Sequence, residues 1–163
     1  KSTGEVMGVG RTFEEAFVKS QMGASVKLPS TGKVFISVKD SDKSKVVVIA
    51  RDLHDAGFNI LATRGTAATI SAAGIPVVTV NKVIEGRPHI VDMIKNNEIS
   101  LIINTADEKR QAINDSRSIR TSGLSARVTM YTTIWGAEAA TVGIKNRGLL
   151  VVYPIQDLHA QLV

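Results

Sequence analysis

Hydroxyl, arginine and glycine residues meet at the junction of an expected strand and an expected helix, between residues 60 and 69. The apolar segment 60–62 is followed by Thr63-Arg64-Gly65-Thr66 and then by small residues that favour a helix. A helix N-terminus offers free backbone N–H groups and the positive end of the helix dipole, which favour an anion. Gly65 leaves room for a close approach, and Thr63 and Thr66 can donate to phosphate oxygens. Two interpretations stay open: a phosphate site, or a helix that Thr66 simply caps.

The positions that could surround such an anion follow from the expected fold. From residue 32 onward, short apolar runs alternate with amphipathic stretches. We expect strands at 34–38, 58–62, 77–80, 101–103 and 128–131. We expect helices at about 46–57, 67–73, 90–94, 108–120 and 134–142, while 149–152 is apolar but ambiguous. The predicted fold class is therefore α/β, a three-layer, doubly wound, mainly parallel sheet of about five strands.

In a doubly wound sheet, ligands bind beyond the carboxyl ends of the strands, near the point where the strand order reverses. This rule selects residues that are mostly hydroxyls, amides and lysines: Ser37, Lys43, 63–66, 81–82, 104–105 and 132–133. A rim of this kind, poor in carboxylates, favours a phosphorylated sugar or nucleotide. It does not favour a divalent metal, so we expect no metal site.

Composition indicates a folded domain and excludes several classes of protein. The chain has 163 residues, of which 44% are hydrophobic and 21% charged, and it has no cysteine. The lack of cysteine excludes a disulfide framework, a cysteine–zinc site and a cysteine nucleophile. No apolar run approaches the roughly 20 residues that cross a bilayer, and no signal-peptide pattern opens the sequence. We expect a soluble, cytoplasmic protein with no membrane partner.

The formal net charge of +5 raises the possibility of a nucleic-acid partner. The basic residues are scattered, however, and only 4% of the residues are aromatic, so stacking platforms are scarce. A small anionic ligand needs only a few converging cations. We therefore expect no nucleic-acid partner.

No catalytic set stands out in the sequence. There is no Gly-x-Ser-x-Gly elbow and no Walker A loop, and His54, His89 and His159 lack metal-ligand spacing. His54 is expected to be solvated. His89 lies near the predicted mouth of the ligand site and has both a structural and a functional interpretation. Trp135 is most simply a core or interface anchor. A binding domain is favoured over an enzyme, and no catalytic residue is predicted.

The first 26 residues differ from the rest of the chain. Thr12 and Glu15 have the spacing of a capping box, and an apolar helical stripe follows at Phe13, Phe17 and Met22. This stripe has few partners in its own segment. We therefore expect residues 1–26 to be the tail of a preceding domain.

Five segments carry a resemblance to a known family: Lys1-Ser2-Thr3-Gly4-Glu5-Val6-Met7-Gly8, Thr63-Arg64-Gly65-Thr66, Val80-Asn81-Lys82-Val83, Glu85-Gly86-Arg87-Pro88-His89-Ile90 and Ile102-Ile103-Asn104-Thr105. They strongly resemble the C-terminal end of the large subunit of bacterial carbamoyl-phosphate synthase, over essentially the whole chain. The resemblance implies that residues 1–26 end the second ATP-grasp synthetase unit. Residues 27–163 would form the methylglyoxal-synthase-like allosteric regulatory domain.

The resemblance implies one overlapping site for nucleoside monophosphates, with UMP as inhibitor and IMP as activator. Its residues, by position and with the neighbouring Thr105 included, would be Ser37, Lys43, Thr63, Thr66, Lys82, Asn104 and Thr105. Lys82, Thr63 and Thr66 would hold the phosphate, while Lys43 and Asn104 place the ribose or base. The family's second threonine after Asn104 is Ala106 here, which removes one hydroxyl from the phosphate site.

The resemblance also implies partners outside this domain. Ornithine would activate from the boundary with the synthetase unit, with Met130 and Thr132 as the expected contacts, and Met130 stands where the family has a tyrosine. The parent enzyme would be a glutamine-hydrolysing, ATP-dependent ligase for pyrimidine and arginine biosynthesis. It would use ATP, magnesium or manganese, and potassium, together with a glutaminase small subunit, and it would oligomerise. This fragment would hold no cofactor.

Methylglyoxal synthase, a lyase of a small phosphorylated substrate, is the rival interpretation within the same superfamily. Those enzymes carry an essential aspartate in a Gly-Gly-Asp segment after the third strand. The matching loop here reads Glu85-Gly86-Arg87-Pro88, with arginine in place of the acid. Because proton abstraction needs a base at this point, we expect the fragment alone to be non-catalytic.

Overall fold

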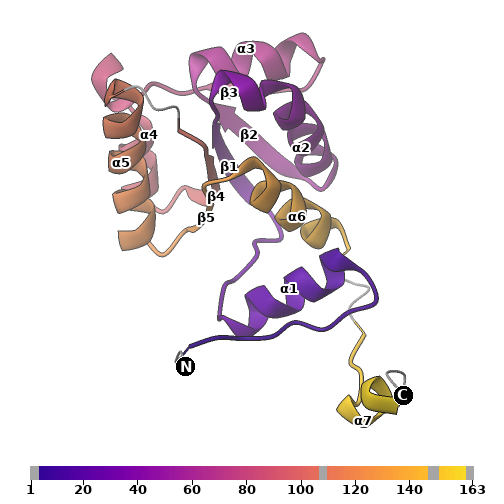
Figure 1. Ribbon diagram of the computed structural model, residues 1–163. Helices are drawn as coiled ribbons and strands as arrows, with labels where there is room; N and C mark the ends of the chain where they lie inside the picture. The colour runs from indigo at the N-terminus through magenta and orange to yellow at the C-terminus, as the bar shows by residue number, and fades with distance from the viewer. Residues whose placement is uncertain (1–3, 107–109, 147–150, 161–163) are drawn as a thin grey trace.

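The fold is a five-stranded, all-parallel sheet with helices on both faces, seen in a computed structural model that describes residues 4–106, 110–146 and 151–160. The strand order is β3-β2-β1-β4-β5 (Figure 1). The strands are β1 (Gly32–Ser37), β2 (Phe58–Ala62), β3 (Val78–Thr79), β4 (Ile99–Asn104) and β5 (Thr129–Tyr131). Each neighbouring pair is parallel, which confirms the predicted α/β sheet.

Two helical layers enclose the sheet (Figure 1). One face is covered by α2 (Lys43–Asp55), α3 (Arg64–Ala72) and α6 (Ile134–Lys145), and the other by α4 (Ile90–Lys95) and α5 (Arg110–Ser125). Successive side chains of β1 alternate between the two layers, because Val34 and Ile36 pack in one core cluster and Phe35 in the other. Burial on both faces explains why the strands are continuous apolar runs.

The strand order reverses between β1, the central strand of the sheet, and its neighbour β4. At their carboxyl ends, Ser37 of β1 is the register partner of Asn104 of β4. Two short 3-10 turns lie beyond the strands at this end: η1 (Asp40–Asp42) after β1, and η2 (Val83–Glu85) after β3. The fold therefore brings the ends of several strands together at the expected position for a ligand.

The start of α3 contradicts one of the two interpretations of Thr66, namely that Thr66 caps the helix. The helix begins at Arg64 with Thr63 at the N-cap, so Thr66 lies inside the first turn and does not cap it. The Thr66 hydroxyl instead accepts a hydrogen bond from the backbone N–H of Val38, at 3.3 Å. Its role is therefore to join the first turn of α3 to the end of β1.

Other elements lie close to their predicted bounds. The third strand is shorter than expected, with two residues, and its Val78 is 61% exposed at the sheet edge. Of the ambiguous segment, Val151 and Val152 are exposed and belong to no strand, while 149–150 lie outside the described residues. The expected start of the helix at 108–120, residues 108–109, also lies outside them. No helix in the described part of the chain combines the length and apolar character needed to cross a membrane.

The N-terminal helix α1 (Phe13–Gly23) packs against α6 (Figure 1). Val18 of α1 is buried, and a Cβ added to Gly143 of α6 would lie 2.2 Å from its Cγ2 atom. The predicted apolar stripe is only partly covered, because Phe13 and Met22 are 68% and 59% exposed. The glycine at position 143 is thus what allows the two helices to approach closely.

Only one of the two hydrogen bonds of the predicted capping box of α1 is formed. Thr12 Oγ1 accepts from the backbone N–H of Glu15, but the Glu15 carboxylate accepts from Arg11 N at 2.9 Å instead of from Thr12. Glu15 also accepts from Lys19 and from the hydroxyl of Tyr153, which precedes α7 (Ile155–Ala160). The hydrogen bond from Lys19 is the largest cause that lowers the pKa of Glu15 to about 2. These contacts fasten the C-terminal segment to α1.

Candidate functional site

Two adjoining pockets lie at the carboxyl ends of the strands. The first, which we call the turn pocket, has a volume of about 240 Å³ and includes the Thr63–Thr66 turn. The second, the switch-point pocket, has a volume of about 140 Å³ and includes Asn104 and Thr105. Ser37 and Lys82 line both pockets. All seven residues of the predicted nucleotide site line one pocket or both: Ser37, Lys43, Thr63, Thr66, Lys82, Asn104 and Thr105.

Three hydroxyl groups form the floor of the turn pocket. Thr63 Oγ1 lies 3.2 Å from Ser37 Oγ and 3.4 Å from Thr66 Oγ1, and both threonines are buried. Thr63 makes no side-chain capping bond to the described residues. The first-turn N–H groups of α3 therefore stay available to a ligand. Because hydroxyls and free amides both donate to oxyanions, the chemistry of this floor fits a phosphate.

Gly65 and Lys43 form the side of the turn pocket. The nearest atom to a Cβ built on Gly65 is Lys43 Nζ, at 3.5 Å. Lys43 lines the turn pocket and not the switch-point pocket, so the structure groups it with the threonine turn rather than with Asn104. An anion that approaches the backbone at Gly65 would meet this lysine directly.

The expectation of a rim poor in carboxylates is wrong, because three of the cations at the pockets each face a carboxylate. Lys43 Nζ lies 2.7 Å from Asp40, Arg64 Nη2 lies 3.6 Å from Glu85, and Lys82 Nζ lies 3.7 Å from Asp115. Two of these acids arrive from the 3-10 turns η1 and η2, and Asp115 arrives from α5. Sequence spacing alone could not bring α5 over this edge of the sheet.

Asp115 is the site residue that sequence reasoning missed. It is 7% exposed and lines the switch-point pocket opposite Lys82. A signal for it exists in the sequence, because Asp115 precedes the buried Ile119 by four residues and so lies on the apolar face of α5. A carboxylate on a buried helix face calls for a partner, and here that partner is Lys82.

Hydrogen bonds fix the end of β4 in the switch-point pocket. Asn104 is 2% exposed, its Oδ1 accepts from the hydroxyl of Ser116, and its backbone carbonyl accepts from Arg120 Nη2 at 3.1 Å. Thr105 N donates to Ser37 O, and Thr105 Oγ1 accepts from Lys39 N, both at 3.1 Å. The pocket therefore has a polar, hydrogen-bonded wall made by the ends of β1 and β4 and by α5.

The remaining candidates line neither of the two pockets. His89 is buried at the N-cap of α4, where its Nδ1 accepts from the backbone N–H of Asp92 at 3.3 Å and its backbone N–H donates to Asp92 Oδ2. Thr133 caps α6, and neither it nor the exposed Thr132 lines the two pockets. Trp135 is 66% exposed under Lys45 Nζ, so it is not a core residue. In the described ranges, no three His, Cys, Asp or Glu side chains gather as a metal site.

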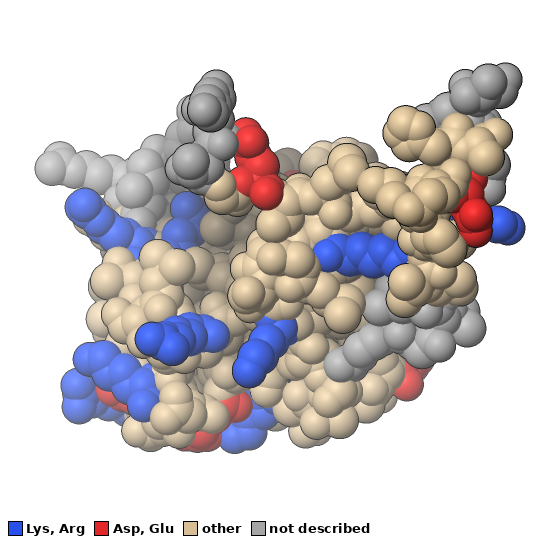
Figure 2. Space-filling view, turned by 90° about the horizontal axis from the view of Figure 1, so that it is seen from below, with Lys and Arg blue, Asp and Glu red and all other residues tan. Residues whose placement is uncertain are grey.

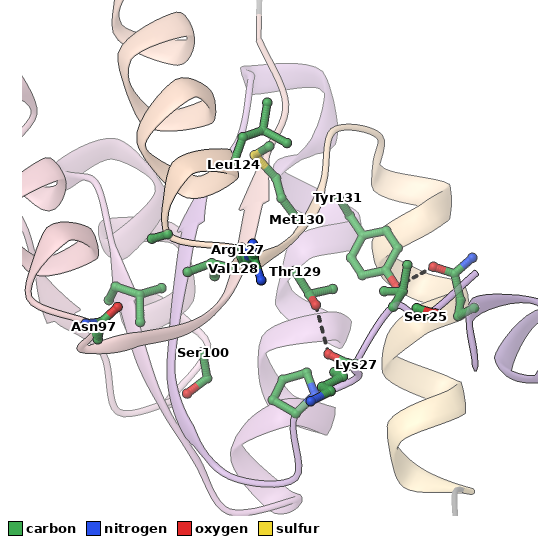
Figure 3. Close-up of a pocket in the computed structure, with 15 residues that line it drawn as sticks. Ser25, Lys27, Asn97, Ser100, Leu124, Arg127, Val128, Thr129, Met130 and Tyr131 are labelled. Atoms are coloured by element: carbon green, nitrogen blue, oxygen red, sulfur yellow. Dashed lines mark hydrogen bonds between the residues drawn. The ribbon is translucent and has the colours of Figure 1, made fainter. Parts of the chain in front are cut away.

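A further pocket of about 790 Å³ lies beside β5, between residues 25–29 and the C-terminal end of α5 (Figure 3). Met130 lines it and Thr132 does not, so the two expected ornithine contacts are not brought into one pocket. Burial raises the pKa of Tyr131, which also lines it, to about 12. On the face seen in Figure 2, lysine and arginine side chains are dispersed among neutral surface and do not form a continuous stripe.

Comparison with known proteins fits this geometry. The family model for MGS-like domains matches residues 45–132, so the chain belongs to the family of MGS-like domains. Over 162 residues, or 99% of its length, it is 61% identical to the carbamoyl phosphate synthase large chain of Ralstonia nicotianae. The identity is 57% to the large chain of Pseudomonas syringae pv. tomato and 49% to that of Neisseria meningitidis serogroup A, again over 99% of this chain. The chain spans 15% of the length of each of these relatives.

Proposed function

We propose that this chain is the regulatory part of a carbamoyl phosphate synthase large chain and binds nucleoside monophosphates. UMP would inhibit the enzyme and IMP would activate it from the same site. The observation that carries the proposal is the meeting of Ser37, Thr63, Thr66, Lys82 and Asn104 at adjoining pockets where the strand order reverses. The 61% identity to a carbamoyl phosphate synthase large chain supports the choice of parent.

The phosphate would lie in the turn pocket. Thr63 and Thr66 would donate their hydroxyls, α3 its first-turn N–H groups, and Lys43 and Lys82 their ammonium groups. Lysines bind phosphate as point charges without strict geometry, so both can reorient from their carboxylate partners toward the ligand. The contacts of Lys43 with Asp40 and of Lys82 with Asp115 would then be exchanged for contacts with phosphate.

The nucleoside would extend from the turn pocket into the switch-point pocket. Asn104 and Thr105 line this pocket, and Asp115 supplies its carboxylate. A carboxylate accepts hydrogen bonds from two ribose hydroxyls, which is a recurring way of binding ribose in doubly wound folds. When Lys82 turns to the phosphate, Asp115 would be released for the ribose.

Regulation would follow if each nucleotide binds two states of the parent enzyme with different affinities. A coupling of about 1–3 kcal/mol between effector and substrate sites is typical of allosteric proteins. The rest of the large chain would carry the ATP-dependent chemistry with magnesium or manganese and potassium, and a small subunit would supply ammonia from glutamine in the cytoplasm. Residues 1–26 would belong to the preceding synthetase unit, and ornithine would act near Met130 and Thr132 at that boundary.

A lyase of the methylglyoxal synthase type is not favoured. The loop after β3 carries Arg87 where a carboxylate base is needed, and the Arg87 guanidinium lies 3.6 Å from Asp92. The three relatives compared above, which match 99% of this chain, are carbamoyl phosphate synthase large chains. Methylglyoxal release from dihydroxyacetone phosphate would be the outcome that revives the lyase interpretation.

Calorimetric titration of this chain with UMP and with IMP tests the proposal. Both nucleotides should bind with one-site stoichiometry, and each should displace the other. Lys82→Ala should weaken both by about tenfold or more, because one charge-assisted contact is lost. Lys95→Ala is the matched control, since Lys95 is exposed in the last turn of α4 and does not line the two pockets. Equal affinities in Lys82→Ala and Lys95→Ala would refute the site.

A further inference from the structure

Two arginines of α5 face a hollow outside the nucleotide site. Arg117 and Arg120 are three residues apart, and with Thr121 and Leu124 they line a pocket of about 320 Å³. The wall shared with the switch-point pocket is made by Ala106 and Ser116, which line both. The hollow therefore adjoins the nucleotide site, and its arginines line neither of the two pockets of that site.

Arg120 is incompletely satisfied in this position. Its Nη2 donates to the backbone carbonyl of Asn104 at 3.1 Å. Its Nε atom is buried, and it is the one buried side-chain polar atom without a hydrogen-bond partner in the part of the chain that the structure describes. A buried donor without a partner is costly, so this N–H calls for an acceptor.

No described residue compensates the charge of the two arginines at the hollow with an ion pair. Neither Arg117 nor Arg120 forms an ion pair with a described residue. The nearest acid along α5, Asp115, is already paired with Lys82. Like charges three residues apart on a helix repel, and an anion between them would relieve that repulsion.

We propose that Arg117, Arg120 and Thr121 form an oxyanion site that takes a carboxylate or phosphate group. Guanidinium groups match the paired oxygens of both anions, and the Thr121 hydroxyl can donate a further hydrogen bond. Ala106 and Leu124 provide an apolar wall for the carbon chain of a carboxylate. The site does not rest on the proposed nucleotide function, although Arg120 connects it to Asn104 of that pocket.

The Nε–Hε signal of Arg120 in a proton–nitrogen correlation spectrum reports on this site directly. Sodium phosphate and sodium acetate are titrated separately, with sodium chloride holding the ionic strength constant, and Arg120→Lys assigns the signal by removing it. We expect a saturable shift with at least one anion. A response to phosphate alone identifies a phosphate site, and a response to acetate identifies a carboxylate site.

Variants test whether the spectral response arises from this site or from other cationic side chains. Arg117→Lys should weaken the response about tenfold, because the fork geometry is lost. Arg127→Lys, two residues beyond the end of α5 and also without an ion-pair partner among the described residues, should leave it unchanged. Lys82→Ala, which disables the turn pocket, should also leave it unchanged. A shift that does not saturate with either anion, an equal loss in Arg127→Lys, or a loss in Lys82→Ala would overturn the proposal.

Discussion

The Nζ atom of Lys82, which follows β3, lies 3.7 Å from Asp115 Oδ2 in α5, and both residues line the switch-point pocket. The lysine side chain is 34% exposed, whereas that of the aspartate is 9% exposed. The buried partner is thus the fixed one, and the lysine is the one that can move. A ligand phosphate can recruit Lys82 without disturbing the packing of α5.

This relationship predicts that Asp115→Asn separates nucleoside binding from phosphate binding. UMP should bind about tenfold more weakly, because a charge-assisted hydrogen bond to the ribose is replaced by a neutral one. Inorganic phosphate should bind no more weakly, because Lys82 loses a competing carboxylate. Calorimetry with both ligands measures the two effects, and Asp157→Asn, exposed in α7, is the control. Parallel weakening of UMP and phosphate would contradict the role given to Asp115.

Thr66→Val should destabilise the fold as well as the site. Thr66 is 2% exposed, and its hydroxyl accepts from the backbone N–H of Val38. Valine keeps the shape and leaves that N–H without an acceptor, which costs about 1–3 kcal/mol. Urea unfolding measures the loss. Thr69→Val on the same helix, where the hydroxyl only bonds back to Gly65 O, should change stability by less than about 0.5 kcal/mol.

Gly143→Ala should loosen the contact between α1 and α6. The added Cβ would lie 2.2 Å from Val18 Cγ2, and such overpacking costs about 1–3 kcal/mol in the free energy of unfolding. Val18→Ala removes the clashing atom. The double variant should therefore be more stable than the sum of the two single losses predicts. Strict additivity in urea unfolding would show that α1 does not pack here.

Tyr131 should ionise near pH 12 rather than near its usual value of 10, because burial disfavours its charged form. The chain has two tyrosines, so Tyr153→Phe leaves Tyr131 as the only phenol in an absorbance titration. The folded state keeps its proton longer than the unfolded state. Stability present below pH 10 is therefore lost as the pH rises from 10 to about 12. A midpoint near 10 in the folded protein would mean that Tyr131 is exposed.

Local patterns were sufficient to predict the sheet and most of the pocket lining. Strand β2 lies at 58–62 as expected, because a short apolar run bounded by Gly57 and Thr63 leaves little choice of register. The rule that ligands bind at strand ends then placed Ser37, Lys82 and Asn104 in one predicted site. In the structure, Ser37 and Lys82 line both pockets, and Asn104 lines the switch-point pocket. In a parallel sheet the carboxyl ends of all strands lie at the same edge, so residues that follow different strands become neighbours there.

Tertiary placement of helices could not be predicted in the same way. Asp115 and Arg120 lie in the middle of a polar helix, and only the packing of α5 against β4 brings them to Asn104. Of the two roles expected for Trp135, the core role is wrong, because the buried face of α6 is formed by Ile134, Ala137 and other residues; the role of an interface anchor stays a prediction. A helix pattern gives a periodicity, but the packing partner decides which face is buried.

A crystal structure of this chain with UMP at saturating concentration tests the central claim most directly. The claim predicts the phosphate within hydrogen-bond distance of Thr63, Thr66 and Lys82, and the ribose next to Asp115. The same crystals soaked in IMP should place its phosphate at the same atoms. Nucleotide bound elsewhere, with the turn pocket holding only solvent, would contradict the account.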